Sequence, residues 1–358
     1  MESEKSIFHR KPTYIIALIL LTGILIFSLI FAVTIGTSDI SMKDVYGVLL
    51  YKILGLGDSD RYASGSITDI VWFIRLPRLV LAISVGAALS VSGSVMQAIV
   101  KNPLADPFIL GVSSGASLGA TLALLLGIGS ALGANYVGVM AFIGAFLVSV
   151  SVIFLANIGG RATSAKLILA GTALSSICSA ISSFVLYVIN NNNNAIAAVG
   201  RWTMGSLASA SWDTNTLMLL VAFVGLIFFC TQYRTLNLML LGDESAITLG
   251  TDLHRWRILY LLVTSVLVGY AVFNAGMIGF VGLIIPHAVR MFFGTDHKKL
   301  LPLAAVTGAI FLLWADVLCR IVIEHAELPI GILTSMIGAP CFVYLMVRRS
   351  YGFGGGER

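Results

Sequence analysis

The residues of this chain that could do chemistry inside a membrane are few, and they lie at the ends of apolar segments. His287 and Arg290 lie near the end of one segment, and a second group closes another: Asp316, Arg320, Glu324, His325 and Glu327. Ion-driven carriers usually place Asp, Glu or His well inside a span, because a buried ionisable group couples the ion to the substrate. Positions at segment ends favour snorkelling or docking instead, which argues against ion coupling by this chain.

The sequence also lacks the motifs of enzymes and of nucleotide binding. It contains no G-x-x-x-x-G-K-[ST] phosphate loop, no H-E-x-x-H motif and no nucleophile elbow. Its four cysteines lie in apolar surroundings without C-x-x-C spacing, so neither a disulfide framework nor a zinc site is indicated. We therefore expect the chain to be no enzyme, and any energy for transport to come from a partner protein.

The elements that must position these residues are membrane-spanning helices. Of the 358 residues, 58% are hydrophobic and only 11% are charged, and the mean hydropathy is +0.97, which excludes an ordinary soluble globule. At roughly 20 residues per crossing, the apolar content predicts about ten helices. The apolar segments are 14–35, 79–100, 108–128, 136–157, 167–189, 215–232, 258–274, 277–293, 300–319 and 329–347. We therefore predict an all-α polytopic membrane protein. Gly111, Gly115 and Gly119 form a small-residue stripe for helix packing.

The distribution of basic residues predicts the topology. If the N-terminus is cytoplasmic, 15 of the 22 lysines and arginines fall on the inner side of the membrane. This excess predicts that both the N-terminal tail (1–13) and the C-terminal tail (348–358) are cytoplasmic, with an even number of crossings. The formal net charge of +5 is explained by these flanking residues, so no nucleic-acid partner is indicated.

The longest polar segment on the predicted inner side, 233–257, is a candidate contact for a soluble partner. Within it, Asp243 is placed as an N-cap, acidic residues occupy the first turn, and Gly250 marks a stop, which together predict a helix of about two turns. Such a helix would offer Ala246, Ile247 and Leu249 to a groove of a partner. From the pattern alone, an ordinary solvated loop is an equal alternative.

Several strings, in order and spacing, resemble one family of membrane proteins. In the first half they are Arg75-Leu76-Pro77-Arg78, Gly86-Ala87-Ala88-Leu89, Asn102-Pro103-Leu104-Ala105-Asp106-Pro107 and Trp202-Thr203-Met204-Gly205-Ser206-Leu207. In the second half they are Leu241-Gly242-Asp243-Glu244-Ser245-Ala246, Phe280-Val281-Gly282-Leu283-Ile284-Ile285-Pro286-His287, Glu327-Leu328-Pro329-Ile330-Gly331 and Ile337-Gly338-Ala339-Pro340. Over about residues 70–347 the chain is similar to the permease subunits of ABC importers for iron–siderophore complexes, haem and cobalamin, the FecCD-type, BtuC-like permeases.

This resemblance implies a fold, partners and a location. It implies a single transmembrane permease domain over 1–358 with about ten helices, in the cell (inner) membrane of a prokaryote. It also implies a second permease subunit, expected to be a second copy of this chain, two cytoplasmic ABC ATPase subunits and an extracytoplasmic substrate-binding protein. ATP and Mg²⁺ are then expected on the partner ATPase, and no cofactor or metal on this chain.

The same resemblance implies roles for particular residues. The helix after the sixth span would couple to the ATPase, through Gly242, Asp243, Glu244, Ser245, Ala246, Leu249 and Gly250. Arg75, Arg78 and Arg320 match outer-face arginines that pair with acidic residues of the binding protein. Thr163 and Ser164 retain part of the hydroxyl-rich loop that forms the cytoplasmic gate.

Two further expectations concern exposure and cargo. Because Pro77 disfavours helical geometry at Leu76, Arg75 and Arg78 are expected at the mouth of the second span and not buried within it. The expected function is import of a bulky metal chelate, with ferric siderophores favoured and cobalamin or haem as alternatives in the same family. An ion-coupled secondary transporter is the alternative from another class.

Overall fold

The computed structural model describes residues 11–348 apart from 37, 190–192 and 324–325. Helices dominate the described residues, and no strand occurs among them. Most of the predicted tails, together with Glu324 and His325 of the second ionisable group, lie outside the described residues.

The membrane-spanning elements agree with the prediction of about ten helices. Seven helices in the described part are long and apolar enough to cross a membrane, and three shorter apolar helices accompany them. The long ones are α2 (Lys11–Ala32), α6 (Leu76–Val100), α8 (Tyr136–Asn157), α9 (Ser164–Val188), α11 (Trp212–Thr231), α14 (Leu253–Ala275) and α16 (His297–Ile321). The shorter ones are α7 (Val112–Leu126), α15 (Val281–Phe293) and α17 (Ile330–Arg348).

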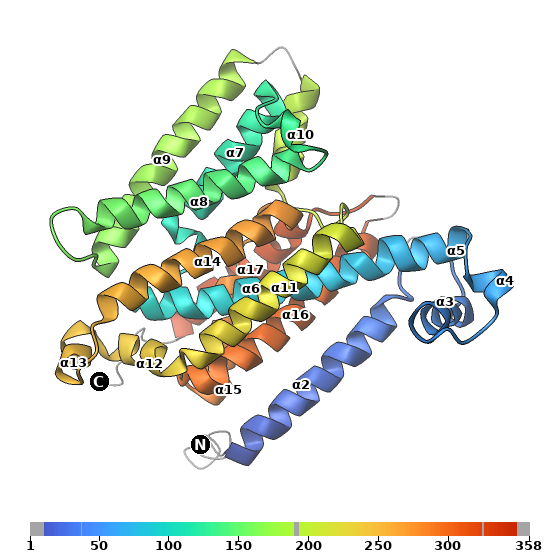
Figure 1. The fold of residues 1–358 in the computed structure, drawn as a ribbon, viewed down its shortest axis with the longest axis horizontal. Helices are drawn as coiled ribbons and strands as arrows, with labels where there is room; N and C mark the ends of the chain where they lie inside the picture. The colour runs from blue at the N-terminus through green and yellow to red at the C-terminus, as the bar shows by residue number, and fades with distance from the viewer. Residues whose placement is uncertain (1–10, 37, 190–192, 324–325, 349–358) are drawn as a thin grey trace.

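Helix α6 is the centre of the molecule, and nearly all of its residues are buried. It packs against α16, α11, α15 and α14, which surround it in Figure 1. Close approach depends on glycines: a Cβ added at Gly86 would overlap the backbone of Gly308, and one added at Gly93 would overlap the backbone of Gly282. Small residues at such crossings replace the hydrophobic driving force that helices lack inside a lipid bilayer.

Helices α7, α8 and α9 form a second group, which joins the first mainly through contacts of α8 with α14. The predicted glycine stripe lies at its centre. A Cβ added at Gly115 would meet the backbone of Gly144, and one at Gly119 would meet the carbonyl of Met140. The predicted packing role of the stripe is thereby confirmed on α7 and α8.

Short helices that the hydropathy pattern did not predict lie between the spans. They are α3 (Met42–Leu54), α4 (Ser59–Tyr62), α5 (Ser66–Thr68), the π-helix η1 (Asp69–Arg75), the 3₁₀ turns η2 (Pro107–Leu110) and η3 (Ser130–Leu132), α10 (Asn193–Thr203), α12 (Tyr233–Leu241) and α13 (Asp243–Thr248). The α3–α4 pair is held by Asp44, which accepts from Tyr62 at 3.1 Å and pairs with Arg61 at 2.6 Å. Their short length, and for some of them their polar composition, hid these elements from a search for long apolar runs.

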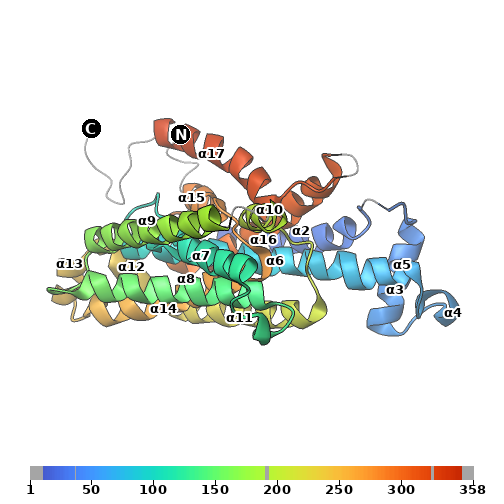
Figure 2. The same cartoon turned by 90° about the horizontal axis from the view of Figure 1, so that it is seen from above.

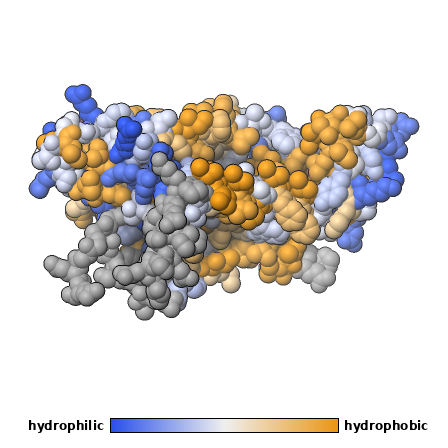
Figure 3. All heavy atoms as spheres, turned by 90° about the horizontal axis from the view of Figure 1, so that it is seen from below, coloured by the Kyte–Doolittle hydropathy of each residue, from blue (hydrophilic) through white to orange (hydrophobic). Residues whose placement is uncertain are grey.

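The long axis of the molecule carries α13 at one end and α3–α5 at the other, and we call these the α13 end and the α3 end (Figures 1 and 2). Helix α2 begins, and α17 finishes, toward the α13 end. The space-filling view shows hydrophobic residues over the middle of the long axis and hydrophilic residues toward both ends (Figure 3). This distribution is that of a protein whose long axis crosses a bilayer.

Candidate docking and coupling sites

The three arginines of the predicted docking surface lie together at the α3 end. Arg75 is the last residue of η1, Arg78 lies in the first turn of α6, and Arg320 lies in the last turn of α16. All three are buried, with 4%, 7% and 6% of their surface exposed. The structure therefore brings the three residues together, but inside the chain.

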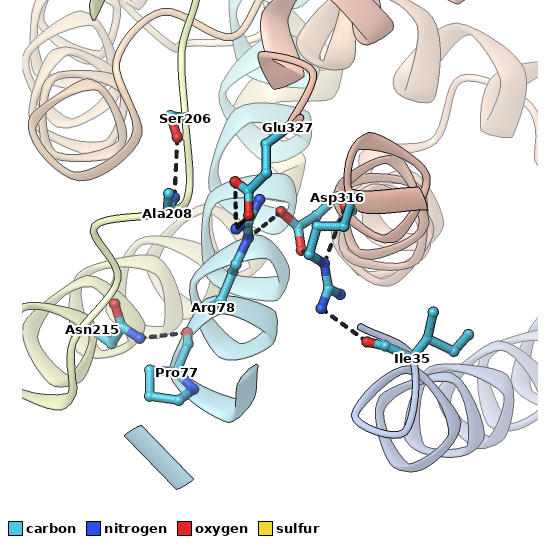
Figure 4. A network of polar contacts seen from close by, with 9 residues as sticks. Ile35, Pro77, Arg78, Ser206, Ala208, Asn215, Asp316 and Glu327 are labelled. Carbon is cyan, nitrogen blue, oxygen red and sulfur yellow. Dashed lines mark hydrogen bonds and ion pairs between the residues drawn. The ribbon is translucent and has the colours of Figure 1, made fainter. Parts of the chain in front are cut away.

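Arg78 and Arg320 belong to a charge cluster with Asp316 and Glu327. The Arg78 Nε donates to Asp316 Oδ1 at 2.7 Å, and its Nη1 donates to both carboxylate oxygens of Glu327 at 2.9 Å (Figure 4). The second oxygen of Asp316 lies 3.2 Å from the Arg320 Nε. Two positive and two negative groups thus balance, as buried charges require.

Arg75 is held by main-chain carbonyls and not by a carboxylate. Its Nη1 donates to Val33 O and Thr34 O, both at 3.1 Å, and its Nη2 donates to Ser38 O at 2.6 Å. Arg320 makes a similar bond, from Nη1 to Ile35 O at 3.1 Å. These carbonyls follow the end of α2, where a helix leaves carbonyls without internal partners, so both arginines fasten the α2–α3 link to the central helices.

The expectation that Arg75 and Arg78 are exposed at a break in the helix is wrong. Leu76 has helical φ and ψ angles of −66° and −46°, and η1 continues into α6 without interruption. Pro77 is tolerated because the preceding turns form a π-helix, in which the Leu76 N–H bonds to Val71 O, five residues back. The wider π turn leaves room for a ring that would clash with the carbonyl four residues back in an α-helix.

The predicted coupling helix exists as α13, and its exposed residues differ from those expected. Its N-cap is Gly242 and not Asp243, its C-cap is Leu249, and Gly250 ends it with a φ of +80°. Ala246 is fully buried against the chain's own helices, so the expectation that it faces a partner is wrong. Ile247 and Leu249 are 55% and 64% exposed, and they are the apolar side chains that α13 offers outward.

Asp243 anchors the beginning of α13 to the body of the protein. Its Oδ1 accepts from the Nη2 of Arg257 at 2.7 Å and lies 3.6 Å from the Lys101 Nζ. Burial on its own would raise the pKa of the Asp243 carboxyl, but the hydrogen bond from Arg257 and the charges of Arg257 and Lys101 outweigh it. The pKa therefore lies below its ordinary value, and the carboxyl is ionised at neutral pH.

The predicted gate residues lie where the short loop between α8 and α9 ends and α9 begins, at the α13 end. Thr163 is the N-cap of α9, and its hydroxyl accepts from the Lys166 N–H at 3.3 Å. Thr163 is exposed and Ser164 is half-buried. This placement on the same end as α13 is compatible with a gate, and nothing in the described contacts tests that role.

Sequence reasoning missed several residues of these sites. In the sequence, Arg257 and Lys101 stand out only as two of the basic residues on the predicted inner side, although both reach Asp243. A usable signal was the apolar run that begins directly after Arg257, which places this arginine at the start of a span, where it is buried. Glu327 and Asp316 were noted as ionisable, but their pairing with Arg78 joins positions 238 and 249 residues apart, which no local pattern reveals.

Neither site, as far as the structure describes it, has the composition of a metal centre. Among the described residues, no group of three His, Cys, Asp or Glu side chains is placed to hold a metal ion. What these sites can do is bind: the α3 end presents a charged cluster with the half-exposed Glu327, and the α13 end presents a short, anchored helix with two apolar side chains.

Comparison with known proteins places this arrangement among membrane permeases. Residues 24–348 match the family model described as the FecCD transport family. The chain is 40% identical over 323 residues to the hemin transport system permease protein HmuU of Yersinia pestis, covering 84% of this chain and 94% of that protein. It is 42% identical over 278 residues to the vitamin B12 import system permease protein BtuC of Salmonella paratyphi A, covering 78% of this chain and 83% of that protein.

A solved structure agrees with these sequence matches. It is described as an inward-facing conformation of a metal-chelate type ABC transporter, and it superimposes with a TM-score of 0.78 at 31% identity. The match covers 93% of this chain and 99% of the solved chain. The resemblance inferred from the motifs is thereby confirmed at the level of both sequence and fold.

Proposed function

Because this chain belongs to the FecCD transport family, we propose that it is the membrane-spanning permease subunit of an ATP-driven importer for a bulky metal chelate. The observation that carries the proposal is α13, a short helix at the α13 end that is anchored through Asp243 and presents Ile247 and Leu249 outward. A chain without a phosphate loop needs such a contact to receive work from an ATPase.

The proposed assembly has the α13 end in the cytoplasm of a prokaryotic cell. Two ABC ATPase subunits, which bind ATP and Mg²⁺, contact α13 in each of two permease subunits, and the permease itself performs no hydrolysis. A second copy of this chain completes the path for the cargo. Thr163 and Ser164, at the α13 end, are proposed to belong to the gate on the cytoplasmic side of that path.

The proposed docking surface for the extracytoplasmic binding protein is the α3 end. Arg75, Arg78 and Arg320 are already paired within the chain, so direct pairing with acidic residues of that protein requires an exchange of partners. Arg78 is best placed for the exchange, because one of its two partners, Glu327, is 45% exposed. A binding-protein carboxylate could then take the position of Glu327.

The cargo we propose is a metal complex too large for an ion channel, from the class that contains ferric siderophores, haem and cobalamin. Two relatives are named for hemin and for vitamin B12, which supports haem and cobalamin, the macrocyclic members of this class, as the cargo. No described side chain selects among the three, because selection in such an assembly rests largely with the binding protein.

A spectrum of the cargo tests this proposal. The permease is purified together with its ATPase and its loaded binding protein, and the absorption of the retained ligand is recorded. Haem, cobalamin and ferric catecholates or hydroxamates have different absorption bands, so the expected result is one of these spectra. Retention of a colourless organic solute, with uptake in cells unaffected by all three chelates, would contradict the proposed cargo class.

A further inference from the structure

At the α13 end, one buried side chain joins two segments to which the proposed function gives different roles. The segments are α13, which would receive work from the ATPase, and the loop between α8 and α9, which would form the gate (Figures 1 and 2). We propose that Arg257 is a positioning residue that makes the α8–α9 loop move with α13. This inference rests on the proposed function and assigns a mechanical role to a residue that touches neither cargo nor ATP.

The geometry of Arg257 is that of a bridge. Its Nη1 donates to the main-chain carbonyl of Ala162, in the α8–α9 loop, at 2.9 Å. Its Nη2 donates to Asp243 Oδ1, in the first turn of α13, at 2.7 Å. Arg257 itself lies in the second turn of α14, so one guanidinium holds three elements together.

Burial makes this bridge stiff. The side chain of Arg257 is 4% exposed and Ala162 is buried, so water cannot easily replace the loop carbonyl, whereas water reaches the other partner, Asp243, which is 46% exposed. Breaking one bond would leave a buried charge incompletely paired, which is much more costly than breaking a solvated contact. When α13 is displaced, Arg257 and the Ala162 carbonyl are therefore expected to move with it, because otherwise one of the two bonds would break.

Arginine is suited to this task and lysine is not. The planar guanidinium presents donors in a fixed fork, so the two bonds keep a constant separation and angle. A lysine has one ammonium group on a flexible stem, and it would satisfy Asp243 or Ala162 with poor geometry for the other. Lys101, 3.6 Å from Asp243, adds positive charge at the same carboxylate from the end of α6.

A second pair between the same regions provides a matched control. Arg161, in the α8–α9 loop, lies 3.5 Å from Asp252, just before α14, and the side chains are 65% and 51% exposed. Exposed pairs of this kind contribute little, because solvent and salt screen them. The same loop is thus attached by one buried and one exposed arginine, and only the buried one is expected to transmit motion.

The test compares Arg257→Met with Arg161→Met in the full permease–ATPase–binding-protein assembly, and it measures cargo imported per ATP hydrolysed. We expect Arg257→Met to lower this ratio by about tenfold, since residues on coupling networks change coupling by about two- to thirtyfold. Arg161→Met should leave it within about twofold of the wild type. Arg257→Lys and Asp243→Asn should give intermediate ratios.

A structural readout accompanies the transport measurement. Spin labels at Ala165→Cys, in the first turn of α9 directly after the loop, and at Thr248→Cys, at the end of α13, report the distance between these two segments in the full chain, in a background without the native cysteines. A narrow distribution in the wild type and in Arg161→Met, and a broad one in Arg257→Met, is expected. A wild-type ratio together with a wild-type distribution in Arg257→Met would overturn the inference.

The outcomes separate this inference from the function on which it rests. If Arg257→Met fails to insert, unchanged ratios and distributions in both Arg257→Lys and Asp243→Asn overturn the inference equally. If the wild-type assembly imports nothing with ATP, the proposed function fails, while the distance distributions still show whether Arg257 ties the two segments.

Discussion

Replacing Asp316 by Asn should destabilise the permease strongly, because it removes the central negative charge of a buried cluster. Asp316 is 1% exposed, and its oxygens lie 2.7 Å from the Arg78 Nε and 3.2 Å from the Arg320 Nε. With charge centres about 4 Å apart and an effective dielectric constant of about 20, each attraction is worth about 4 kcal/mol. Part of this lost attraction is offset, because a carboxylate no longer has to be desolvated on folding. The net loss in the free energy of unfolding is therefore expected to be about 3–5 kcal/mol, as is typical when a buried pair is broken.

Thermal unfolding of the detergent-purified permease measures this effect. The matched control is Glu327→Gln, which removes the same charge from the same Arg78 but at a side chain that is 45% exposed. We expect Glu327→Gln to lower the free energy of unfolding by about 1 kcal/mol, because solvent screens the Arg78–Glu327 pair. The fall in the unfolding temperature should therefore be much smaller than in Asp316→Asn. An Asp316→Asn protein that unfolds at the wild-type temperature, or a Glu327→Gln protein at least as unstable, would refute the reasoning.

The remaining predictions concern the two ends and the packing between them. Ile247→Arg, at an exposed position of α13, should weaken co-purification of the ATPase while the permease still inserts, as measured by the yield of each subunit. Gly93→Val should lower the free energy of unfolding by about 1–3 kcal/mol, measured by thermal unfolding, because the valine side chain would collide with the Gly282 backbone. The pKa of the Asp243 carboxyl is depressed, so its ionised form and its bond to Arg257 are fully present above the ordinary carboxyl pKa and are lost only as the pH falls below that value. We therefore expect titration of Asp243 to leave the amount of cargo transported per ATP unchanged between pH 6 and 8. Arg78→Gln breaks the buried pair with Asp316 and should therefore lower the unfolding temperature; in the protein that remains folded it should also slow association of the binding protein, measured by stopped flow, and this effect should shrink as salt rises.

Each of these predictions has a control or an opposing outcome. Gly200→Ala should be nearly neutral beside Gly93→Val, because no atom lies within 4 Å of the added Cβ. If the Ile247→Arg permease retained its ATPase in full yield, α13 would not be part of the contact with the ATPase. Steep loss of coupling between pH 8 and 6 would show that a group other than Asp243 controls it. Binding-protein association that is unchanged in Arg78→Gln at low salt would remove Arg78 from the docking surface.

The spans and their packing could be predicted from sequence because lipid imposes one rule on every residue of a span. A helix must satisfy its own backbone and face apolar chains, so hydropathy alone indicated α2, α8 and α16. The four-residue spacing of glycines indicated close packing of α7, and the structure shows that its partner is α8. The short helices α3 and α10 obey no such rule. Helix α3, for example, is held by the hydrogen bond of Asp44 with Tyr62, which the sequence does not reveal.

The candidate sites could be located from sequence, but not their internal partners. The motifs indicated where Arg78 and Asp243 lie, yet the burial of Arg78 depends on Asp316, 238 residues away, and on the π turn that accommodates Pro77. Burial of Ala246 likewise depends on how α13 packs on its neighbours, so the outward face of a six-residue helix could not be assigned from its sequence alone.

Cargo uptake into proteoliposomes tests the central claim most directly. The permease is reconstituted with its ATPase and loaded binding protein, and import is measured with ATP, with an ATPase that cannot hydrolyse it, and with an uncoupler that abolishes ion gradients. We expect import with the active ATPase only, and no effect of the uncoupler. Import that continues with the inactive ATPase and collapses with the uncoupler would contradict the account and identify an ion-coupled carrier.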